Sequence, residues 1–311
     1  MATIPALPSS DKGINLGYPA VFVTLLVWVG FFISLRAGAK SVLTIADIAQ
    51  IRFTLPAIFF CYIVFKQRKK IIQVPKRYLI GIICGSGLPF FYLGATGMQY
   101  APVAHGSTLI PGTLPLFVTG IAVLVFKEPL SRSRKLGLSA IGVGILILLS
   151  SALMSFDMQL FKGHLYFLFA SLLWAIFTIS MRMSGLNAFE GAGVSAFGSL
   201  LLLGPYLLLS GDQFHFHIAP ANELLFQFIV QGVCVGLIAG FSYGFAISRL
   251  GAEMTAAFGS FTPVLAGLVA IPVFGEWLNL SSIFGMLFIT LGTLLASEVF
   301  RKTDNNKNVI G

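Results

Sequence analysis

Charged residues are scarce in this sequence. Asp, Glu, Lys and Arg make up 10% of its 311 residues, whereas a soluble globular domain carries about 25%. So few charges would not keep a soluble fold in solution, and the composition therefore excludes an ordinary soluble protein. The hydrophobic residues, 57% of the chain, form long runs between short polar breaks, which is typical of a membrane protein that crosses the bilayer several times.

Motifs for disulfides, metals and nucleotides are lacking as well. Cys61, Cys84 and Cys234 form no CxxC pair and all lie inside apolar runs, so neither a disulfide framework nor a zinc site is indicated. His215 and His217 stand two residues apart with no third ligand near them, which argues against a metal site. No phosphate-binding loop occurs, so the chain does not encode ATP drive. We expect no cofactor.

Ten apolar runs dominate the chain. Each is close to the roughly 20 residues that a helix needs to cross about 30 Å of hydrocarbon. Their approximate ranges are 16–36, 45–65, 77–98, 102–126, 135–153, 162–182, 191–210, 224–248, 254–274 and 282–300. The polar segments 1–15 and 301–311 are expected to be tails, and no stretch is left for a soluble domain. The sequence thus predicts an all-α membrane protein with ten transmembrane helices.

The net charge of +9 could suggest nucleic acid, but its placement does not. Sixteen of the 20 Lys and Arg residues fall in the tails and loops on one side of the ten-span topology, and three (Arg36, Lys40 and Lys162) fall on the other side. Arg52 lies within a span. This asymmetry follows the positive-inside rule and predicts both termini in the cytoplasm, in the inner (plasma) membrane. The expected macromolecular partner is the bilayer, and nucleic acid is excluded.

The second half of the sequence repeats the first. Residues 25–36 (LLVWVGFFISLR) align with 171–182 (SLLWAIFTISMR) at an offset of 146, and 112–144 align with 260–292 at an offset of 148. The third and eighth spans align at 150 or at 151. Several blocks in one order at nearly one offset indicate an internal duplication.

Each repeat holds five spans, an odd number, so the second repeat must enter the membrane from the opposite side. We expect a first five-helix repeat at 16–153 and a second, inverted one at 162–300. Inverted repeats are the architecture of many secondary transporters, whose substrate site lies near the midplane between the halves.

The paired motifs resemble the EamA-like, ten-helix branch of the drug/metabolite transporter superfamily. The residues that carry the resemblance are Leu26-Val27-Trp28, Leu172-Leu173-Trp174, Arg52-Phe53, Ala101, Ala104, Pro115, Glu128-Pro129-Leu130, Gly137 and Gly142-Val143-Gly144, with Ala252, Ala256, Pro263, Glu276-Trp277-Leu278, Gly285 and Gly292. The resemblance covers nearly the whole chain and implies a metabolite transporter. One departure is that the second repeat has Ser195 or a neighbour where the first has Arg52.

Arg52 is the sharpest candidate for a substrate contact. It lies about seven residues into its span, roughly 10 Å deep, where a charge costs about 2.5–3.5 kcal/mol or more and faces a cavity or a partner. It would bind a substrate anion, or else it would snorkel outward or pair with Asp47 or a helix end. His105, at the start of the fourth span, could couple transport to protons or be an interfacial loop residue.

Trp28 and Trp174 occupy equivalent repeat positions inside their spans. They could be interfacial anchors, but a pair related by two-fold symmetry would line a central cavity from both sides. The further residues predicted to bind substrate are Phe32, Phe91, Tyr92, His105, Thr108, Thr178, Phe241, Tyr243 and Phe261. Aromatic walls suit amphipathic or ring-bearing ligands.

Other residues have predicted roles in gating or packing. Pro111 and Pro115 interrupt the fourth span and Pro263 the ninth, which predicts hinges or packing kinks near the cavity. Glu128 and Glu276 follow these spans and would act in gating or in capping. Gly232, Gly236, Gly240 and Gly244 recur every four residues, a row that predicts close helix packing.

The sequence therefore predicts a secondary transporter for a small amphipathic metabolite, such as an amino acid or a nucleoside derivative, working by alternating access. One alternative is a flippase for a lipid or a lipid-linked carrier on the same fold. A membrane-embedded enzyme is disfavoured because the spans lack clustered His, Asp and Glu. The sequence leaves a homodimer open.

Overall fold

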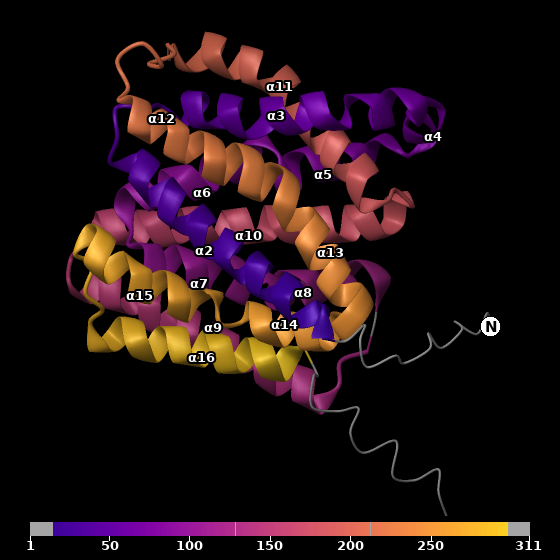
Figure 1. The fold of residues 1–311 in the computed structure, drawn as a ribbon. Helices are drawn as coiled ribbons and strands as arrows, with labels where there is room; N and C mark the ends of the chain where they lie inside the picture. Colours follow the sequence, from indigo (N-terminus) through magenta and orange to yellow (C-terminus); the bar gives the residue numbers. More distant parts are fainter. Residues whose placement is uncertain (1–14, 128, 212, 298–311) are drawn as a thin grey trace, which may run out of the picture.

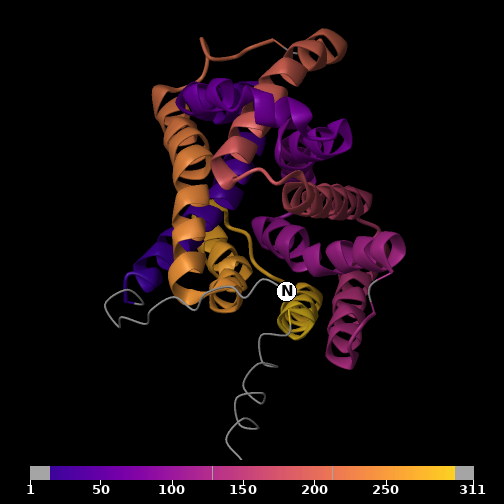
Figure 2. The same cartoon turned by 90° about the vertical axis from the view of Figure 1, so that its right-hand side faces the viewer.

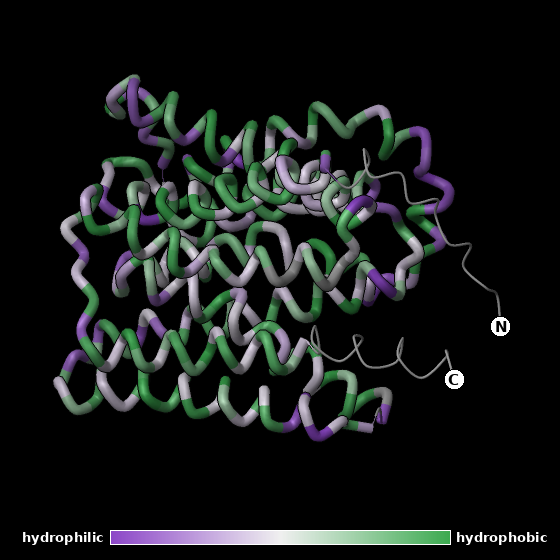
Figure 3. The backbone as a smooth tube through the Cα atoms, turned by 60° about the horizontal axis from the view of Figure 1, so that its bottom comes forward, coloured by the Kyte–Doolittle hydropathy of each residue, from purple (hydrophilic) through white to green (hydrophobic). Residues whose placement is uncertain are grey.

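The structure is a computed structural model that describes residues 15–127, 129–211 and 213–297. These residues contain helices and connecting turns but no strands. The long helices run roughly side to side in Figure 1, so the membrane normal lies along the horizontal of that view. Hydrophobic residues follow the helices, and hydrophilic ones gather toward their ends (Figure 3).

Eight of the helices, some of them built from consecutive segments, are long and apolar enough to cross a membrane, and two further apolar helices are shorter. The first half comprises α2 (Gly17–Ala39), α3 (Ile45–Lys66), the short α4 (Arg68–Gln73), α5 (Lys76–Ser86), α6 (Leu88–Tyr100), α7 (Val103–Gly112), α8 (Leu114–Phe126) and α9 (Arg132–Met154). The second half comprises α10 (Met158–Ser184), α11 (Ala188–Ser210), α12 (Ala221–Gln227), the π-helix η1 (Phe228–Ile238), α13 (Ala239–Leu250), α14 (Ala252–Gly259), α15 (Thr262–Phe274) and α16 (Leu280–Ala296).

These bounds refine the expected runs. The sixth run begins at Met158 rather than 162, and the tenth is described as helix only to Ala296. The third, fourth, eighth and ninth runs are each built from consecutive segments. The predicted tails, 1–15 and 301–311, lie outside the described residues except for residue 15, and Glu128 lies outside them too.

Prolines explain two of the helix breaks. The fourth run is divided at Thr113 and the ninth at Ser260 and Phe261. In both cases a proline, Pro115 or Pro263, occupies the first turn of the helix that follows. Proline has no N–H, and the first turn of a helix needs none, so these residues start α8 and α15 after a break that lies inside the membrane.

Capping fixes the beginning of α3 and of α11. The Thr44 hydroxyl accepts a hydrogen bond from the Asp47 N–H, and the Asp47 carboxylate accepts one from the Thr44 N–H. Asn187 and Glu190 form the same reciprocal box at the start of α11. Each box satisfies two backbone donors that a helix start leaves open. The two boxes are 143 residues apart, so Ser195 is the counterpart of Arg52.

The last helices of the two halves pack closely against each other. The backbone of α9 approaches that of α16 so tightly that a Cβ on Gly137 would lie 2.6 Å from the Gly292 carbonyl oxygen, and one on Gly144 would lie 2.6 Å from that of Gly285. Gly137 and Gly285 are repeat equivalents, as are Gly144 and Gly292. Exchanging the halves therefore maps one contact onto the other. This pair forms one flank of the molecule, opposite α3 and α11 (Figures 1 and 2).

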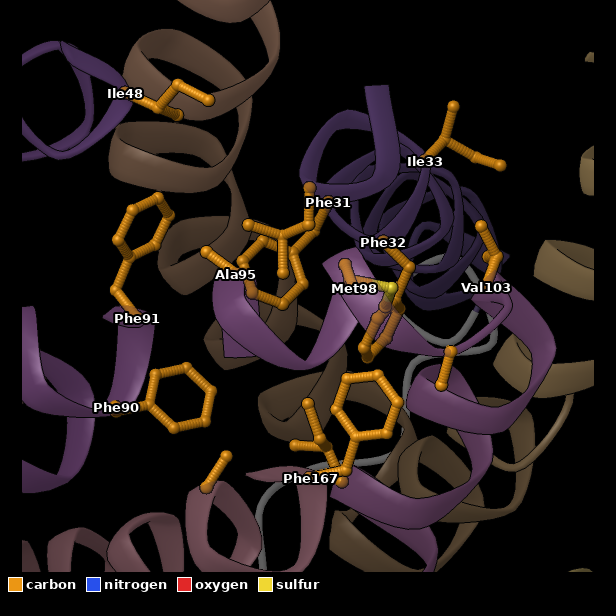
Figure 4. Close-up of a cluster of buried hydrophobic side chains, with 14 of the residues drawn as sticks. Phe31, Phe32, Ile33, Ile48, Phe90, Phe91, Ala95, Met98, Val103 and Phe167 are labelled. Carbon is orange, nitrogen blue, oxygen red and sulfur yellow. The ribbon is translucent and has the colours of Figure 1, made fainter. Parts of the chain in front are cut away.

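The main core lies between α2, α6, α7 and α10. Phe167 of α10 is fully buried there, beside Met98 (Figure 4). Its ring fits because its neighbours are glycines: a Cβ on Gly97 would lie 2.5 Å from the ring and one on Gly106 would lie 2.8 Å from it. Side-chain burial on this scale stabilises the packing of the first half against α10.

Candidate functional site

A central cavity of about 750 Å³ lies between the two halves. Both halves contribute to its wall. The lining residues used below come from α2 (Trp28), α3 (Arg52, Phe53, Pro56), α5 (Ser86), α7 and α8 (Thr108, Pro111, Pro115), α10 (Trp174, Phe177, Thr178, Met181), α11 (Gly191, Ser195), η1 and α13 (Gly236, Gly240, Tyr243, Gly244, Ile247), α15 (Pro263) and the end of α16 (Thr293, Ser297). Figure 2 shows α13 and α10, both of which supply lining residues, on different sides of the molecule.

The cavity extends toward one end of the helices. Its lining reaches Met181, Gly191, Ile247 and Ser297, which lie at or near helix ends on the side where α2 begins and α3 ends. We call this side the open end. On the opposite side, where α2 ends and α3 begins, the lining stops several residues short of the helix ends. We call that side the closed end.

Glu276 connects several elements at the closed end. Its Oε1 atom lies 2.5 Å from the Arg36 Nε atom and 3.9 Å from the Lys40 Nζ atom, and its Oε2 atom accepts the Val103 N–H at 2.9 Å. The Arg36 guanidinium also donates to the Met98 carbonyl. The Arg36 and Glu276 side chains are only 15% and 11% exposed. One carboxylate thus joins α2 to the start of α7 and to the segment after α15. The contacts of Glu276 therefore go beyond the capping role that the sequence left open.

His105 also lies at the closed end, buried and outside the cavity lining. Its Nδ1 atom is 2.8 Å from Nε2 of His164 on α10, and its Nε2 atom is 2.7 Å from the Ser282 hydroxyl on α16. The interfacial loop position considered from the sequence is therefore wrong, because His105 lies within α7 and links three helices. Its predicted part in proton coupling stays a prediction.

Arg52 is the one charged side chain among the described residues of the cavity wall. Its Nη1 atom donates to the Gln231 side-chain oxygen at 2.9 Å. The rings of Phe31, Phe53 and Phe91 surround the guanidinium, with centroids 5.2, 5.5 and 5.6 Å from Cζ. Asp47, considered as its partner, instead caps α3 and accepts the His215 N–H at 3.0 Å. Arg52 has no carboxylate partner among the described residues.

Of the predicted aromatic pocket, the tryptophans and Tyr243 line the cavity. Trp28 packs against Tyr243 with ring centroids 5.2 Å apart, and Trp174 meets Phe90 edge to face at 5.5 Å. The two indoles lie near the middle of α2 and α10, as their equivalent repeat positions predicted. They are half-buried, so each presents part of its ring to the cavity.

The other predicted aromatic residues do not line the cavity. Phe32 and Phe91 are buried in the core, and Tyr92 packs edge to face on Tyr206. Phe241 is 64% exposed and meets Phe189 of α11, while Phe261 is exposed at the break before α15. Residues two apart on a helix point about 200° apart, so Tyr243 can face the cavity while Phe241 faces away from it.

The predicted hydroxyl and proline positions do lie at the cavity. Thr108, Thr178, Pro111, Pro115 and Pro263 all belong to its lining. The Thr108 and Thr178 hydroxyls donate to backbone carbonyls four residues earlier in their own helices. Thr178 is exposed, whereas Thr108 is fully buried. The hinge role of the prolines stays a prediction, as does that of Glu128, which lies outside the described residues.

The glycine row divides into two parts. A Cβ on Gly236 would lie 2.6 Å from the Pro56 ring of α3, and one on Gly232 would lie 3.5 Å from the Ile51 carbonyl. Added Cβ atoms on Gly240 and Gly244 would meet nothing within 4 Å, and both residues line the cavity. The packing expected for the whole row thus occurs against α3 in its first half, while the second half widens the cavity.

The sequence reasoning missed a polar ladder beside Arg52. Ser34 of α2 is hydrogen-bonded to the side chains of Gln227 and Gln231, both fully or nearly buried. Gln231, which lies within the π-helix η1, in turn accepts a hydrogen bond from Arg52. Two glutamines four residues apart in an apolar run could have signalled this ladder, since buried amides require partners.

These features define a class. A helical membrane protein with two similar halves, a cavity between them and a seal at one end has the architecture of a small-molecule transporter. The EamA-like transporter family model matches residues 15–150 and again residues 161–298. The chain therefore belongs to the EamA-like transporter family and is an integral, multi-pass membrane protein.

Similar proteins agree with this assignment. The uncharacterized transporter YoaV of Bacillus subtilis is 23% identical over 284 residues, covering 89% of this chain and 95% of YoaV. The uncharacterized transporter YyaM of the same organism is 22% identical over 264 residues, covering 80% of this chain and 83% of YyaM. A solved structure described only as the crystal structure of a protein shares the fold with a TM-score of 0.60 at 15% identity, covering 95% of this chain and all of that one.

Proposed function

We propose that this protein is a secondary transporter that moves a small amphipathic metabolite by alternating access. The observation that carries the proposal is the central cavity, which is lined by both halves, extends to the open end and is sealed at the closed end by Glu276 and His105. Its volume of about 750 Å³ falls within the range of small-molecule sites. Its aromatic and aliphatic walls suit an apolar body.

The ten-span, inverted arrangement is part of this proposal. The eight long helices and the two shorter ones, Thr262–Phe274 and Leu280–Ala296, make ten crossings if α14 and α15 together complete the ninth. The reciprocal glycine contacts between α9 and α16 support inversion, since each contact has a counterpart when the halves are exchanged. Rocking of two such halves about a central site is how inverted repeats alternate their access.

The distribution of basic residues supports a cytoplasmic open end. Among the described residues, Lys66, Arg68 and Lys76 are examples of the cluster near the ends of α3 and α5, whereas the closed end carries Arg36, Lys40 and Lys162. Under the positive-inside rule, this distribution supports the proposal that both termini are cytoplasmic and that the structure is an inward-open state. Reporter fusions at Gly311 and in the 213–220 loop should report opposite sides of the inner membrane, and fusions that report one side would overturn the assignment.

Thiol accessibility tests alternating access without knowledge of the substrate. In a background without native cysteines, Thr178→Cys places a thiol on the cavity wall and Gln213→Cys places one in the exposed loop at the closed end. In oriented vesicles, an impermeant reagent should reach Thr178→Cys from the cytoplasmic side, and Gln213→Cys only from the other side. Simultaneous labelling of Thr178→Cys from both sides would indicate a channel and contradict the proposal.

A further inference from the structure

We propose that Arg52, held by Gln231, is an anion subsite, so that the transported compound carries one negative charge on an apolar or aromatic body. This inference rests on the proposed function and deepens it by naming the substrate class. It depends on four features of the cavity: the charge it contains, the fixed orientation of that charge, the asymmetry of the two halves, and the apolar walls.

The first feature is an uncompensated charge. Among the described lining residues, Arg52 is the one charged side chain. Its Nε atom is buried without a hydrogen-bond partner, and Nη2 makes no hydrogen bond or ion pair within the described part of the chain. A charge at this depth in a membrane protein is costly unless a partner or water-filled cavity compensates it. A ligand anion would supply the missing charge.

The second feature is a fixed guanidinium. Gln231 accepts from Nη1, and Gln231 in turn donates to Ser34 at 2.6 Å. The three phenylalanine rings around Cζ restrict the guanidinium further and stabilise its charge through their π-faces. A planar, restrained guanidinium suits a carboxylate or phosphate oxygen pair better than a flexible ammonium does.

The third feature is asymmetry between the halves. Arg52 of α3 contacts η1, and its repeat counterpart Ser195 of α11 makes the matching contact with α5, where the Ser195 and Ser86 hydroxyls are 2.9 Å apart. The same place in the two halves therefore holds a cation on one side and a neutral hydroxyl on the other. The described lining contains no carboxylate that could bind an ammonium group.

The fourth feature is the wall that the rest of the ligand would meet. Trp28, Trp174, Phe177 and Tyr243 line the cavity between the Arg52 level and the open end. Rings at these positions favour an apolar or aromatic body attached to the anionic group. The predicted selectivity is therefore a monoanion over the neutral, cationic or zwitterionic compound with the same body.

A matched series of ligands tests the charge requirement. We would measure binding of 3-phenylpropionate, its amide, 3-phenylpropylamine and phenylalanine to the purified full-length protein, by thermal shift and by quenching of tryptophan fluorescence. The wild type should bind the carboxylate more tightly than the other three. Preference for the amide or the amine, or no response to the carboxylate, would overturn the anion subsite.

Variants at Arg52 complete the test. Arg52→Gln should weaken binding of 3-phenylpropionate by about 10- to 100-fold, the scale of one charged hydrogen-bonded contact, while Arg52→Lys retains part of the affinity. The matched control is Arg182→Gln, which removes the same charge from an exposed site at the end of α10. Unchanged carboxylate affinity in Arg52→Gln would overturn the proposal.

The experiments distinguish failure of the anion subsite from failure of the proposed alternating access. If Arg52→Gln does not fold, Arg52→Lys and the wild-type ligand series still decide the charge requirement. Failure of the anion subsite would leave the labelling pattern of Thr178→Cys unchanged, whereas failure of alternating access would appear there whatever ligand is used. A long-chain phosphate monoester tests whether a lipid headgroup is the source of the anion. If inorganic phosphate and this ester both displace 3-phenylpropionate, the requirement for a small apolar body is overturned.

Discussion

The two ends of the molecule are held together in different ways. At the closed end, Glu276 and His105 each connect elements from both halves, through an ion pair and through a chain of hydrogen bonds. At the open end, the ion pair between Lys70 and Glu190, 2.6 Å long, also joins the two halves, but it links α4 to α11 on one flank of the molecule. The proposed alternating-access mechanism needs a seal that can be broken on one side at a time, and we propose that the polar contacts of the closed end form such a seal.

Removing the closing carboxylate should have the largest effect. Glu276→Gln leaves Arg36 without a charged partner in a largely buried site, which typically costs about 3 kcal/mol or more. We expect a buried thiol near the closed end outside these contacts, such as Ser107→Cys, to become more reactive toward the impermeant reagent, and transport to fall. Glu190→Gln is the control, and it should leave that reactivity unchanged. Equal effects of the two substitutions would show that Glu276 does not seal the cavity.

Packing should also be tighter near the closed end than in the cavity that extends to the open end. Gly97→Ala would place a methyl group 2.5 Å from the Phe167 ring near the closed end, whereas Gly244→Ala would meet nothing within 4 Å in the cavity. Overpacking should destabilise Gly97→Ala by about 1–3 kcal/mol, while Gly244→Ala should gain up to about 1 kcal/mol of helix propensity. Thermal unfolding of the purified variants measures both, and a Gly244→Ala variant less stable than Gly97→Ala would refute this difference.

The cavity tryptophans should affect binding more than folding. Trp28→Ala or Trp174→Ala removes one wall of the cavity, and each should weaken ligand binding by about 1–3 kcal/mol. Monodispersity should change little, since each indole is only half-buried. Gly236→Leu is the contrasting variant, because it should prevent the close approach of η1 to Pro56 and damage folding. Unaltered ligand affinity in both tryptophan variants would remove them from the site.

The smallest effect is expected from the Ser282 hydroxyl. Ser282→Ala leaves the buried Nε2 atom of His105 without its partner at 2.7 Å, which should cost about 1 kcal/mol. Closed-end labelling of a nearby thiol should rise slightly, in the same direction as for Glu276→Gln. Ser133→Ala, at an exposed hydroxyl near the open end, is the control and should be neutral. A larger effect from Ser133→Ala would contradict the assignment of the seal.

Periodicity and repeat matching predicted the helical class and the general position of the tryptophans, and the resemblance of the paired motifs indicated the family. They did not place Phe91, Tyr92 and Phe241 correctly. Whether a side chain lines the cavity depends on the rotation of its helix to within a fraction of a turn, and repeat matching does not fix that rotation. The register of the third and eighth spans was open by one residue, which corresponds to about 100° of rotation. The π-helix at η1 changes this rotation again.

The sequence by itself determined that the chain must be helical and embedded in a membrane, because long apolar runs can satisfy their backbone hydrogen bonds in lipid only within helices or closed barrels. It also determined the duplication, since paired motifs such as Trp28 and Trp174 need no structure to be seen. Only the tertiary structure decided the partners of Arg52, Glu276 and His105. Each makes its deciding contacts more than 50 residues away in the chain, and such contacts depend on how whole helices pack rather than on any local pattern.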